Sequence, residues 1–142
     1  MKYVLVLLMC VLAGVATAEK DVIRIPPNIL QTALNCLAET GVNPEVLPQF
    51  GNPHMYDKNN DKRVHKFINC TFTKVGYAKK NGHVRIDRVT EVLSKDIDAN
   101  KRAGLKKVME ECNKENGSDA AETTFRIFGC FIKNSPVKLS LS

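Results

Sequence analysis

Apolar residues recur at intervals of three and four along this chain, with polar and turn-forming residues between the apolar groups. This spacing places the apolar side chains on one face of a helix and leaves the other face to water. Alternating apolar and polar residues, which would indicate strands, do not compete with this pattern over the body of the chain. The pattern predicts helices over residues 29–40, 61–75, 87–93, 98–115 and 120–135.

Capping residues support these bounds. Asn28 with Gln31 is expected to begin the first helix, and Gly41 to end it. Asp61 or Asn60 is expected to cap the second. The remaining signals are Asp87 at the start of the third helix, Gly117 after the fourth, a capping box formed by Asp119 and Glu122, and Pro136 after the last.

The segments between the helices are predicted to be irregular. Residues 43–50 are expected to form one short turn at most, because Pro48 lacks a backbone donor. Residues 51–60 are predicted to be a polar loop. Asn81-Gly82 signals a hairpin only between alternating strands, and Lys79-Lys80 argues against one. Residues 137–142 form an alternating tail that is expected to lie across an otherwise all-α domain.

The N-terminus has the features of an export signal. Lys2 is followed by an apolar run over residues 4–15, and Ala16-Thr17-Ala18 offers small residues for cleavage. We therefore expect residues 1–18 to be a signal peptide and residues 19–142 to form one secreted, extracellular domain. No later stretch approaches the roughly 18 apolar residues of a membrane span.

Charge narrows the possible partners. Removing Lys2 leaves 20 Lys and Arg against 15 Asp and Glu in the 124 remaining residues. The positive residues are scattered among acidic ones, which is typical of a solvated surface. Nucleic acid is therefore not an expected partner.

Four cysteines remain after cleavage, at Cys36, Cys70, Cys112 and Cys130. Their wide spacing does not fit a tetrahedral zinc site and is typical of disulfides in a small secreted protein. Four cysteines allow three pairings, and the count alone does not choose among them. The pairing that closes the shortest loops is Cys36–Cys70 with Cys112–Cys130.

This cysteine arrangement, with the helix order and the segment at residues 81–87, resembles the insect odorant-binding proteins. Their common six-cysteine members have two further cysteines, at the positions of Lys66 and Ala121 here. The chain is therefore similar to the four-cysteine Minus-C subgroup. The usual pairing in that family is again Cys36–Cys70 with Cys112–Cys130.

The resemblance implies a compact domain of about six helices around an apolar cavity. Such a protein carries small hydrophobic ligands, such as odorants or pheromones, as a monomer or weak dimer, with a chemoreceptor as a further partner and no cofactor. Flexible Met and flat Phe side chains suit an adaptable pocket. The candidate ligand-binding residues are Met55, Phe72, Val89, Leu93, Leu105, Val108, Met109, Phe125, Phe128 and Ile132.

Two other classes of function remain as alternatives. His54, His65 and His83 could serve a small ribonuclease-like hydrolase, although their spacing indicates no shared site, so we predict no enzymatic activity. The second alternative is an extracellular interaction protein without a ligand cavity. Residues 57–61 resemble the start of a calcium loop, but Lys62 and Ile68 occupy positions that need Gly and a carboxylate, so no metal site is predicted.

Overall fold

The computed structural model describes residues 22–58, 61–93, 95 and 97–140. The predicted signal peptide, residues 1–18, lies outside this part of the chain. The helices are α2 (Pro27–Thr40), the 3₁₀ helix η1 (Pro44–Gln49), α3 (Met55–Lys58), α4 (Lys62–Lys74), α5 (Ile86–Leu93), α6 (Ala99–Cys112) and α7 (Ala120–Asn134). Two three-residue strands, β1 (Val22–Arg24) and β2 (Lys138–Ser140), flank them. The all-α fold class is confirmed, with this small sheet as an addition.

Most of the predicted caps are present. The Asp61 side chain accepts a hydrogen bond from Arg63 N at 2.9 Å, as predicted. Asp98, which was predicted only as the start of the fourth helix, caps α6 by accepting a hydrogen bond from Lys101 N at 3.0 Å. Asp119 accepts one from Glu122 N at 2.8 Å. The cap predicted at Asn28 is wrong, because α2 begins at Pro27, two residues before the predicted start at residue 29, and Pro26 is at the cap position. Proline suits the first helical position, where its missing N–H is not needed.

Residues 43–58 contain more helix than the sequence predicted. The six-residue helix η1 includes Pro48 and is begun by Asn43, whose side chain accepts from Glu45 N at 3.0 Å. A 3₁₀ helix this short has few backbone bonds for a proline to remove. Helix α3 lies within the expected polar loop, and its first residue, Met55, is buried in the core.

The rejected hairpin at Asn81-Gly82 exists in a minimal form. Lys79 N donates to His83 O at 2.8 Å, Arg85 N donates to Tyr77 O at 2.7 Å, and Ala78 pairs with Val84 as a single antiparallel bridge. Gly82 has φ +93°, and a Cβ there would collide with the Ala120 carbonyl oxygen. Lys79 and Lys80 are exposed at the turn, so neither needs to be apolar and the pair does not prevent a hairpin.

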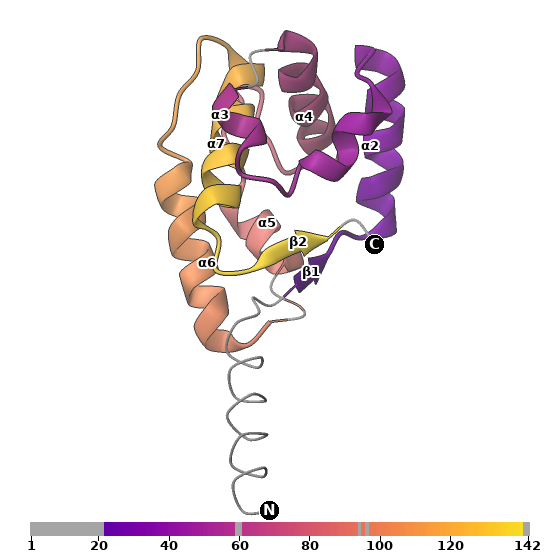
Figure 1. Ribbon diagram of the computed structural model, residues 1–142. Coiled ribbons are helices and arrows are strands. Elements are labelled where there is room, and N and C mark those ends of the chain that lie inside the picture. Colours follow the sequence, from indigo (N-terminus) through magenta and orange to yellow (C-terminus); the bar gives the residue numbers. More distant parts are fainter. Residues whose placement is uncertain (1–21, 59–60, 94, 96, 141–142) are drawn as a thin grey trace, which may run out of the picture.

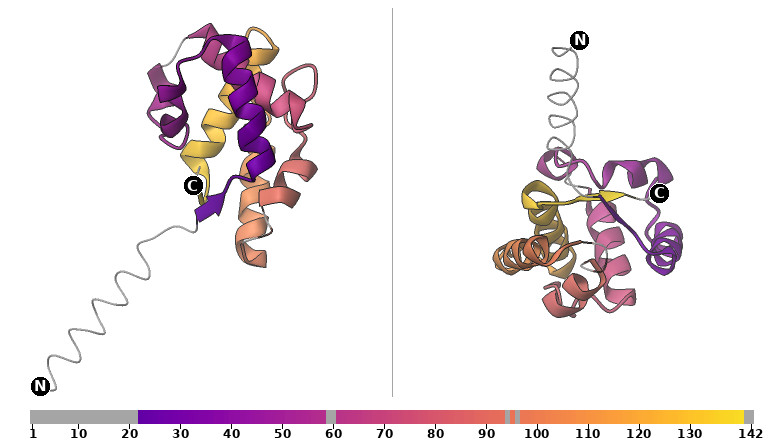
Figure 2. Two further views of the ribbon diagram at one scale, coloured as in Figure 1. Left: turned by 90° about the vertical axis from the view of Figure 1, so that its right-hand side faces the viewer. Right: turned by 90° about the horizontal axis from the view of Figure 1, so that it is seen from below.

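The helices are arranged so that α2 and α6 lie on opposite sides of the molecule, with α4 and α7 between them (Figures 1 and 2). Two disulfides join these helices in pairs. Cys36–Cys70 joins α2 to α4 with Cα atoms 6.0 Å apart, and Cys112–Cys130 joins α6 to α7 with Cα atoms 5.5 Å apart. The predicted pairing is therefore confirmed.

The C-terminal tail lies beside the N-terminal strand. β1 and β2 are parallel, with Ile23 opposite Leu139, and they cross the lower side of the helices in Figure 1. Val137, just before β2, is buried among residues of α5, α6 and α7. The tail thus follows the body of the protein, as predicted. Leu141 lies outside the described residues.

Candidate functional site

Two adjacent apolar cavities lie between the helices. The first, here called the η1 cavity, has a volume of about 80 Å³ and is lined by Ile25, Ile29, Leu30, Ala33, Leu47, Phe50, Phe67, Ile68, Thr71, Phe72 and Phe128. The second, the α5 cavity, has a volume of about 90 Å³ and is lined by Ile25, Pro26, Ile29, Phe72, Tyr77, Val84, Val89, Met109, Ile127, Phe128 and Phe131.

Four residues line both cavities and therefore separate them: Ile25, Ile29, Phe72 and Phe128. The rings of Phe72 on α4 and Phe128 on α7 meet edge to face, with their centroids 5.1 Å apart and their planes at 79°. Edge-to-face contact is a favoured arrangement of aromatic rings. This ring contact is therefore part of the division between the two cavities.

Polar groups are few in the cavity walls. The Thr71 hydroxyl donates to Phe67 O at 3.0 Å within its own helix, so it is already satisfied. Burial raises the pKa of Tyr77, and the nearby Glu91 carboxylate adds to this effect, so the Tyr77 hydroxyl keeps its proton. Among the described lining residues none carries a charge. The walls suit an uncharged apolar molecule.

The structure places the predicted ligand-binding residues in several environments. Phe72 and Phe128 line both cavities, and Val89 and Met109 line the α5 cavity. The remaining described residues line neither cavity: Met55 and Leu105 are buried in the core, Val108 and Ile132 pack against it, and Phe125 borders a separate polar cleft. The side chain of Leu93 is outside the described part of the structure.

Sequence reasoning missed several lining residues, notably Ile25 and Ile29. Ile25 precedes the first helix and belongs to no periodic pattern, so only its apolar character was available as a signal. Ile29 is on α2, at the first residue of the helix predicted over residues 29–40, where the apolar residues at intervals of three and four include Leu30, Ala33, Leu34 and Leu37. Leu34 is 45% exposed, so the buried face of α2 is rotated away from it.

A polar cleft of about 480 Å³ lies outside these cavities, along one face of α7. It is lined by Tyr56, Asp57, His65, Glu115, Glu122, Phe125, Arg126, Gly129, Cys130, Lys133 and Asn134. Tyr56 packs its ring over Gly129, where any Cβ would collide with it. Its hydroxyl donates to Phe50 O at 2.7 Å, and burial raises its pKa.

The charged groups of the cleft are largely paired with one another. Lys133 bonds to Asp57 across the cleft, and Arg126 lies 2.7 Å from a Glu122 carboxylate oxygen. Hydrogen bonds from Ser118, with further help from Arg126, lower the pKa of Glu122 to about 2. Glu122 therefore stays ionised down to strongly acidic pH.

Two of the three histidines lie near this cleft. His65 stacks on Phe125 with ring centroids 4.3 Å apart. The exposed His54 lies 3.9 Å from Asp57, which already bonds to Lys133. His83 belongs to the hairpin, where its Nδ1 is buried without a hydrogen-bond partner. The fold thus brings His54 and His65 closer to a common cleft than their spacing suggested.

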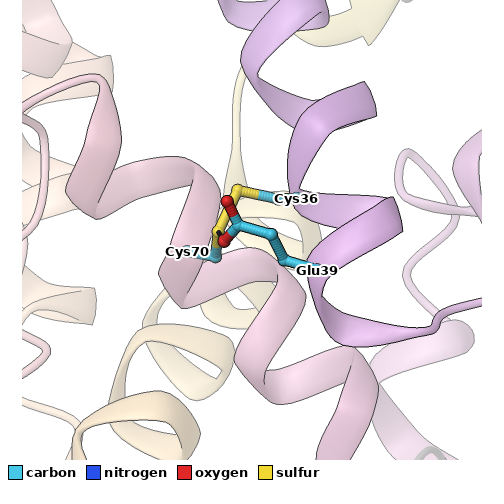
Figure 3. A group of neighbouring side chains, drawn as sticks. All are labelled: Cys36, Glu39 and Cys70. Carbon is cyan, nitrogen blue, oxygen red and sulfur yellow. Dashed lines mark hydrogen bonds between the residues drawn. A yellow bond between two sulfur atoms is a disulfide. The ribbon is translucent and has the colours of Figure 1, made fainter.

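One group of potential metal ligands occurs in the described part of the chain, formed by Cys36, Glu39 and Cys70 (Figure 3). The two sulfur atoms are joined in a disulfide, and Glu39 forms an ion pair with Lys74. A metal ion needs free thiolates, so this group does not fit one. At the calcium-like segment, Asp61 caps α4 and Ile68 is buried.

Among the described helices, none is both long enough and apolar enough to cross a membrane.

Known proteins are similar to this chain in sequence and in architecture. Odorant-binding protein 10 of Aedes aegypti is 26% identical over 130 residues, which cover 92% of this chain and 88% of the relative. A medfly odorant-binding protein of known structure is 25% identical, with a TM-score of 0.59 over 77% of this chain and 89% of the other.

A further solved structure is that of a fatty acid binding protein from the oral disk of the blowfly Phormia regina. It is 26% identical, with a TM-score of 0.55 over 75% of this chain and 88% of its own. The profile of the PBP/GOBP family matches residues 19–134, which is most of the chain. The chain therefore belongs to the PBP/GOBP family of insect odorant-binding proteins.

Proposed function

We propose that this protein is a secreted, non-enzymatic carrier that binds small hydrophobic compounds, such as odorants or pheromones, and transports them through aqueous secretion. The observation that carries this proposal is the pair of adjacent apolar cavities inside a member of the odorant-binding protein family. The alternative of an interaction protein predicted a filled core, and the cavities argue against it. A chemoreceptor is the proposed recipient of the ligand.

Secretion rests on the N-terminal sequence. The family match begins at residue 19, which directly follows the proposed cleavage site after Ala18. We also assign the chain to the four-cysteine Minus-C subgroup, because it has two disulfides and carries Lys66 and Ala121 where relatives have a third. N-terminal sequencing of the secreted protein should start at Glu19, and a start elsewhere would move the domain boundary.

Binding is expected to depend on the burial of apolar surface. Each Å² removed from water contributes roughly 25 cal/mol before the costs of association are subtracted. The cavity walls combine aromatic rings with the flexible Met109, which can adjust to different shapes. Selectivity based on polar contacts should therefore be weak.

The direct test is displacement of a fluorescent apolar probe by a panel of volatile and fatty compounds. At least some members should displace it, and a complete lack of displacement would refute the carrier function. Nuclease and esterase assays on the same sample test the enzymatic alternative. Catalysis that disappears in the His65→Ala variant would favour a hydrolase centred on the polar cleft.

Phe128→Ala tests whether the cavities are the binding site. Phe128 is half-buried between them, so we expect weaker binding of small ligands and a loss of about 2 kcal/mol in the free energy of unfolding, below the usual range for a fully buried Phe. Titration calorimetry and urea unfolding measure both effects. Unchanged affinity with a large loss of stability would remove Phe128 from the site.

Removal of residues 138–142 tests whether the tail closes the site. The deletion removes β2 but retains the buried Val137. β1 then loses its partner, and Ile25, which follows β1 and lines both cavities, is held less firmly. Ligand dissociation, measured by stopped flow, should become faster. An unchanged dissociation rate would exclude the tail as part of the closure.

A further inference from the structure

Neither cavity can hold a typical ligand by itself. A cavity of roughly 150 Å³ accommodates benzene, and ligand pockets usually exceed about 300 Å³. The volumes here are about 80 Å³ and about 90 Å³. A molecule with more than a few carbon atoms must therefore extend through both cavities, past the residues that separate them.

The separating rings are held by two helices whose spacing is set nearby. Asn69 Nδ2 on α4 donates to Thr124 Oγ1 on α7 at 3.0 Å, and Thr124 donates to Gly82 O at 2.7 Å. Phe72 follows Asn69 by three residues and Phe128 follows Thr124 by four, so each ring lies about one turn beyond this hydrogen-bonded link. A ligand is therefore accommodated by rotation of the rings more readily than by separation of the helices.

We propose that the contact between Phe72 and Phe128 determines which ligands this protein takes, admitting slender, uncharged compounds and discriminating against wide or anionic ones. This inference rests on the proposed carrier function and specifies its ligand class. A linear chain needs only a narrow passage beside the two rings. A compact polycyclic molecule must displace at least one ring from its contact, and such overpacking is costly.

The absence of charge in the described walls limits the ligand further. A carboxylate placed in either cavity would lose its hydration without gaining a cationic partner among the lining residues. The Thr71 hydroxyl is unavailable as a donor because it is bonded to Phe67 O, and the protonated Tyr77 hydroxyl of the α5 cavity can donate a hydrogen bond but carries no charge to neutralise a carboxylate. A fatty acid should therefore bind less well than the alcohol of equal length, although a blowfly relative is described as a fatty acid binding protein.

The experiment compares decan-1-ol with camphor, because both have ten carbons and one oxygen but differ in width. Titration calorimetry at neutral pH should show that the protein binds decan-1-ol about tenfold more tightly. Decanoate serves as the anionic counterpart of decan-1-ol and should bind at least about tenfold more weakly than the alcohol.

Phe72→Leu should narrow the ratio of decan-1-ol to camphor affinity to about threefold or less, by strengthening camphor binding. Phe128→Leu opens the same contact from the other helix and provides a second variant if the first folds poorly. Phe125→Leu is the matched control. Phe125 is on α7 like Phe128 but lines neither cavity and packs against Tyr56 and His65, so the ratio should not change.

Equal affinities for decan-1-ol and camphor in the native protein would overturn the width argument, and so would a change of the affinity ratio in Phe125→Leu as large as that in Phe72→Leu. Decanoate binding as tightly as the alcohol would overturn the charge argument. In each case binding persists and the carrier function stands. If none of the three compounds binds at all, the proposed function fails together with this inference.

Discussion

The two disulfide-linked helix pairs, α2 with α4 and α6 with α7, are held together in different ways. Cys36–Cys70 joins residues separated by 34 positions, whereas Cys112–Cys130 joins residues separated by 18. The α2–α4 pair has an additional ion pair between Glu39 and Lys74. The α6–α7 pair instead has a short direct connection, residues 113–119, and therefore depends less on its disulfide.

The contact between the two pairs, where α4 packs on α7, differs from both. α4 and α7 pack closely, and the described structure joins them by the Asn69–Thr124 hydrogen bond and by Phe72–Phe128 contact, without a disulfide. Both cavities border this junction. The disulfides thus link the helices within each pair, whereas the described contacts between the pairs at the α4–α7 junction are non-covalent.

The largest expected effect comes from removing the disulfides one at a time. Replacing Cys36 and Cys70 with Ala should lower the free energy of unfolding by about 4 kcal/mol, and replacing Cys112 and Cys130 by about 3 kcal/mol, because the first bridge closes the longer loop. Urea unfolding without reductant measures both values. The reverse order would show that loop length does not govern the difference between the pairs.

Adding a disulfide between α4 and α7 should remove the difference between this junction and the two disulfide-linked helix pairs. Lys66→Cys with Ala121→Cys is expected to form a disulfide between α4 and α7 and to stabilise the protein by about 3 kcal/mol. Hydrogen exchange of α4 and α7 should become slower. Peptide mapping checks that the bridge has formed, and two persistent free thiols would show that these positions do not face each other.

A smaller loss is expected from Thr124→Val, which removes the hydroxyl that links α4, α7 and the hairpin. Thr124 is fully buried, so Asn69 Nδ2 and Gly82 O lose a partner, at a cost of about 2 kcal/mol. The matched control is Thr123→Val. The Thr123 hydroxyl bonds only near the start of α7, to Gly117 N and Asp119 O.

Hydrogen exchange separates these two variants. Thr124→Val should speed exchange in α4, whereas Thr123→Val should affect only the first turn of α7. If both variants changed α4 equally, the Asn69–Thr124 hydrogen bond would not be what couples the helices.

The smallest effect is expected from Glu39→Gln. The Glu39–Lys74 ion pair is about half exposed on both sides, so its loss should cost about 0.5 kcal/mol or less and matter less in high salt. Glu111→Gln, which breaks an exposed pair with Lys114 inside one segment, is the control. A melting-temperature loss several times larger for Glu39→Gln would indicate that the ion pair supports the neighbouring disulfide.

The helices could be predicted from the sequence because their signals are local. Apolar residues three and four positions apart and the caps at Asp61, Asp98 and Asp119 involve neighbours in the chain. The disulfide pairing also followed, with support from the resemblance to a known family. The errors at Asn28 and in the hairpin also have local causes. Pro27 begins α2 ahead of Asn28, and Gly82 allows the tight turn that Lys79-Lys80 was taken to argue against.

The division between core and cavity wall could not be predicted, because it depends on which helix lies opposite each side chain. Leu105 and Met109 are four residues apart on the same face of α6, yet only Met109 lines a cavity. Both belong to the same apolar stripe and have similar apolar side chains, so the sequence pattern does not distinguish them. Ile25 lines both cavities and directly follows β1, which pairs with β2. That pairing joins segments far apart in sequence, so no short sequence pattern reveals it.

The pairing of β1 with β2 also determines when, during synthesis, the fold can be completed. β1 emerges before every described helix and β2 emerges after them, so the strands cannot pair until α7 has been translated. Contacts between such distant segments form late in folding, because the intervening chain must first be ordered. We therefore expect Ile25, which follows β1 and lines both cavities, to take its final place as one of the last steps. Until then we expect the apolar interior to be accessible from that side, so that in the proposed secretory route a ligand can enter before the chain has closed.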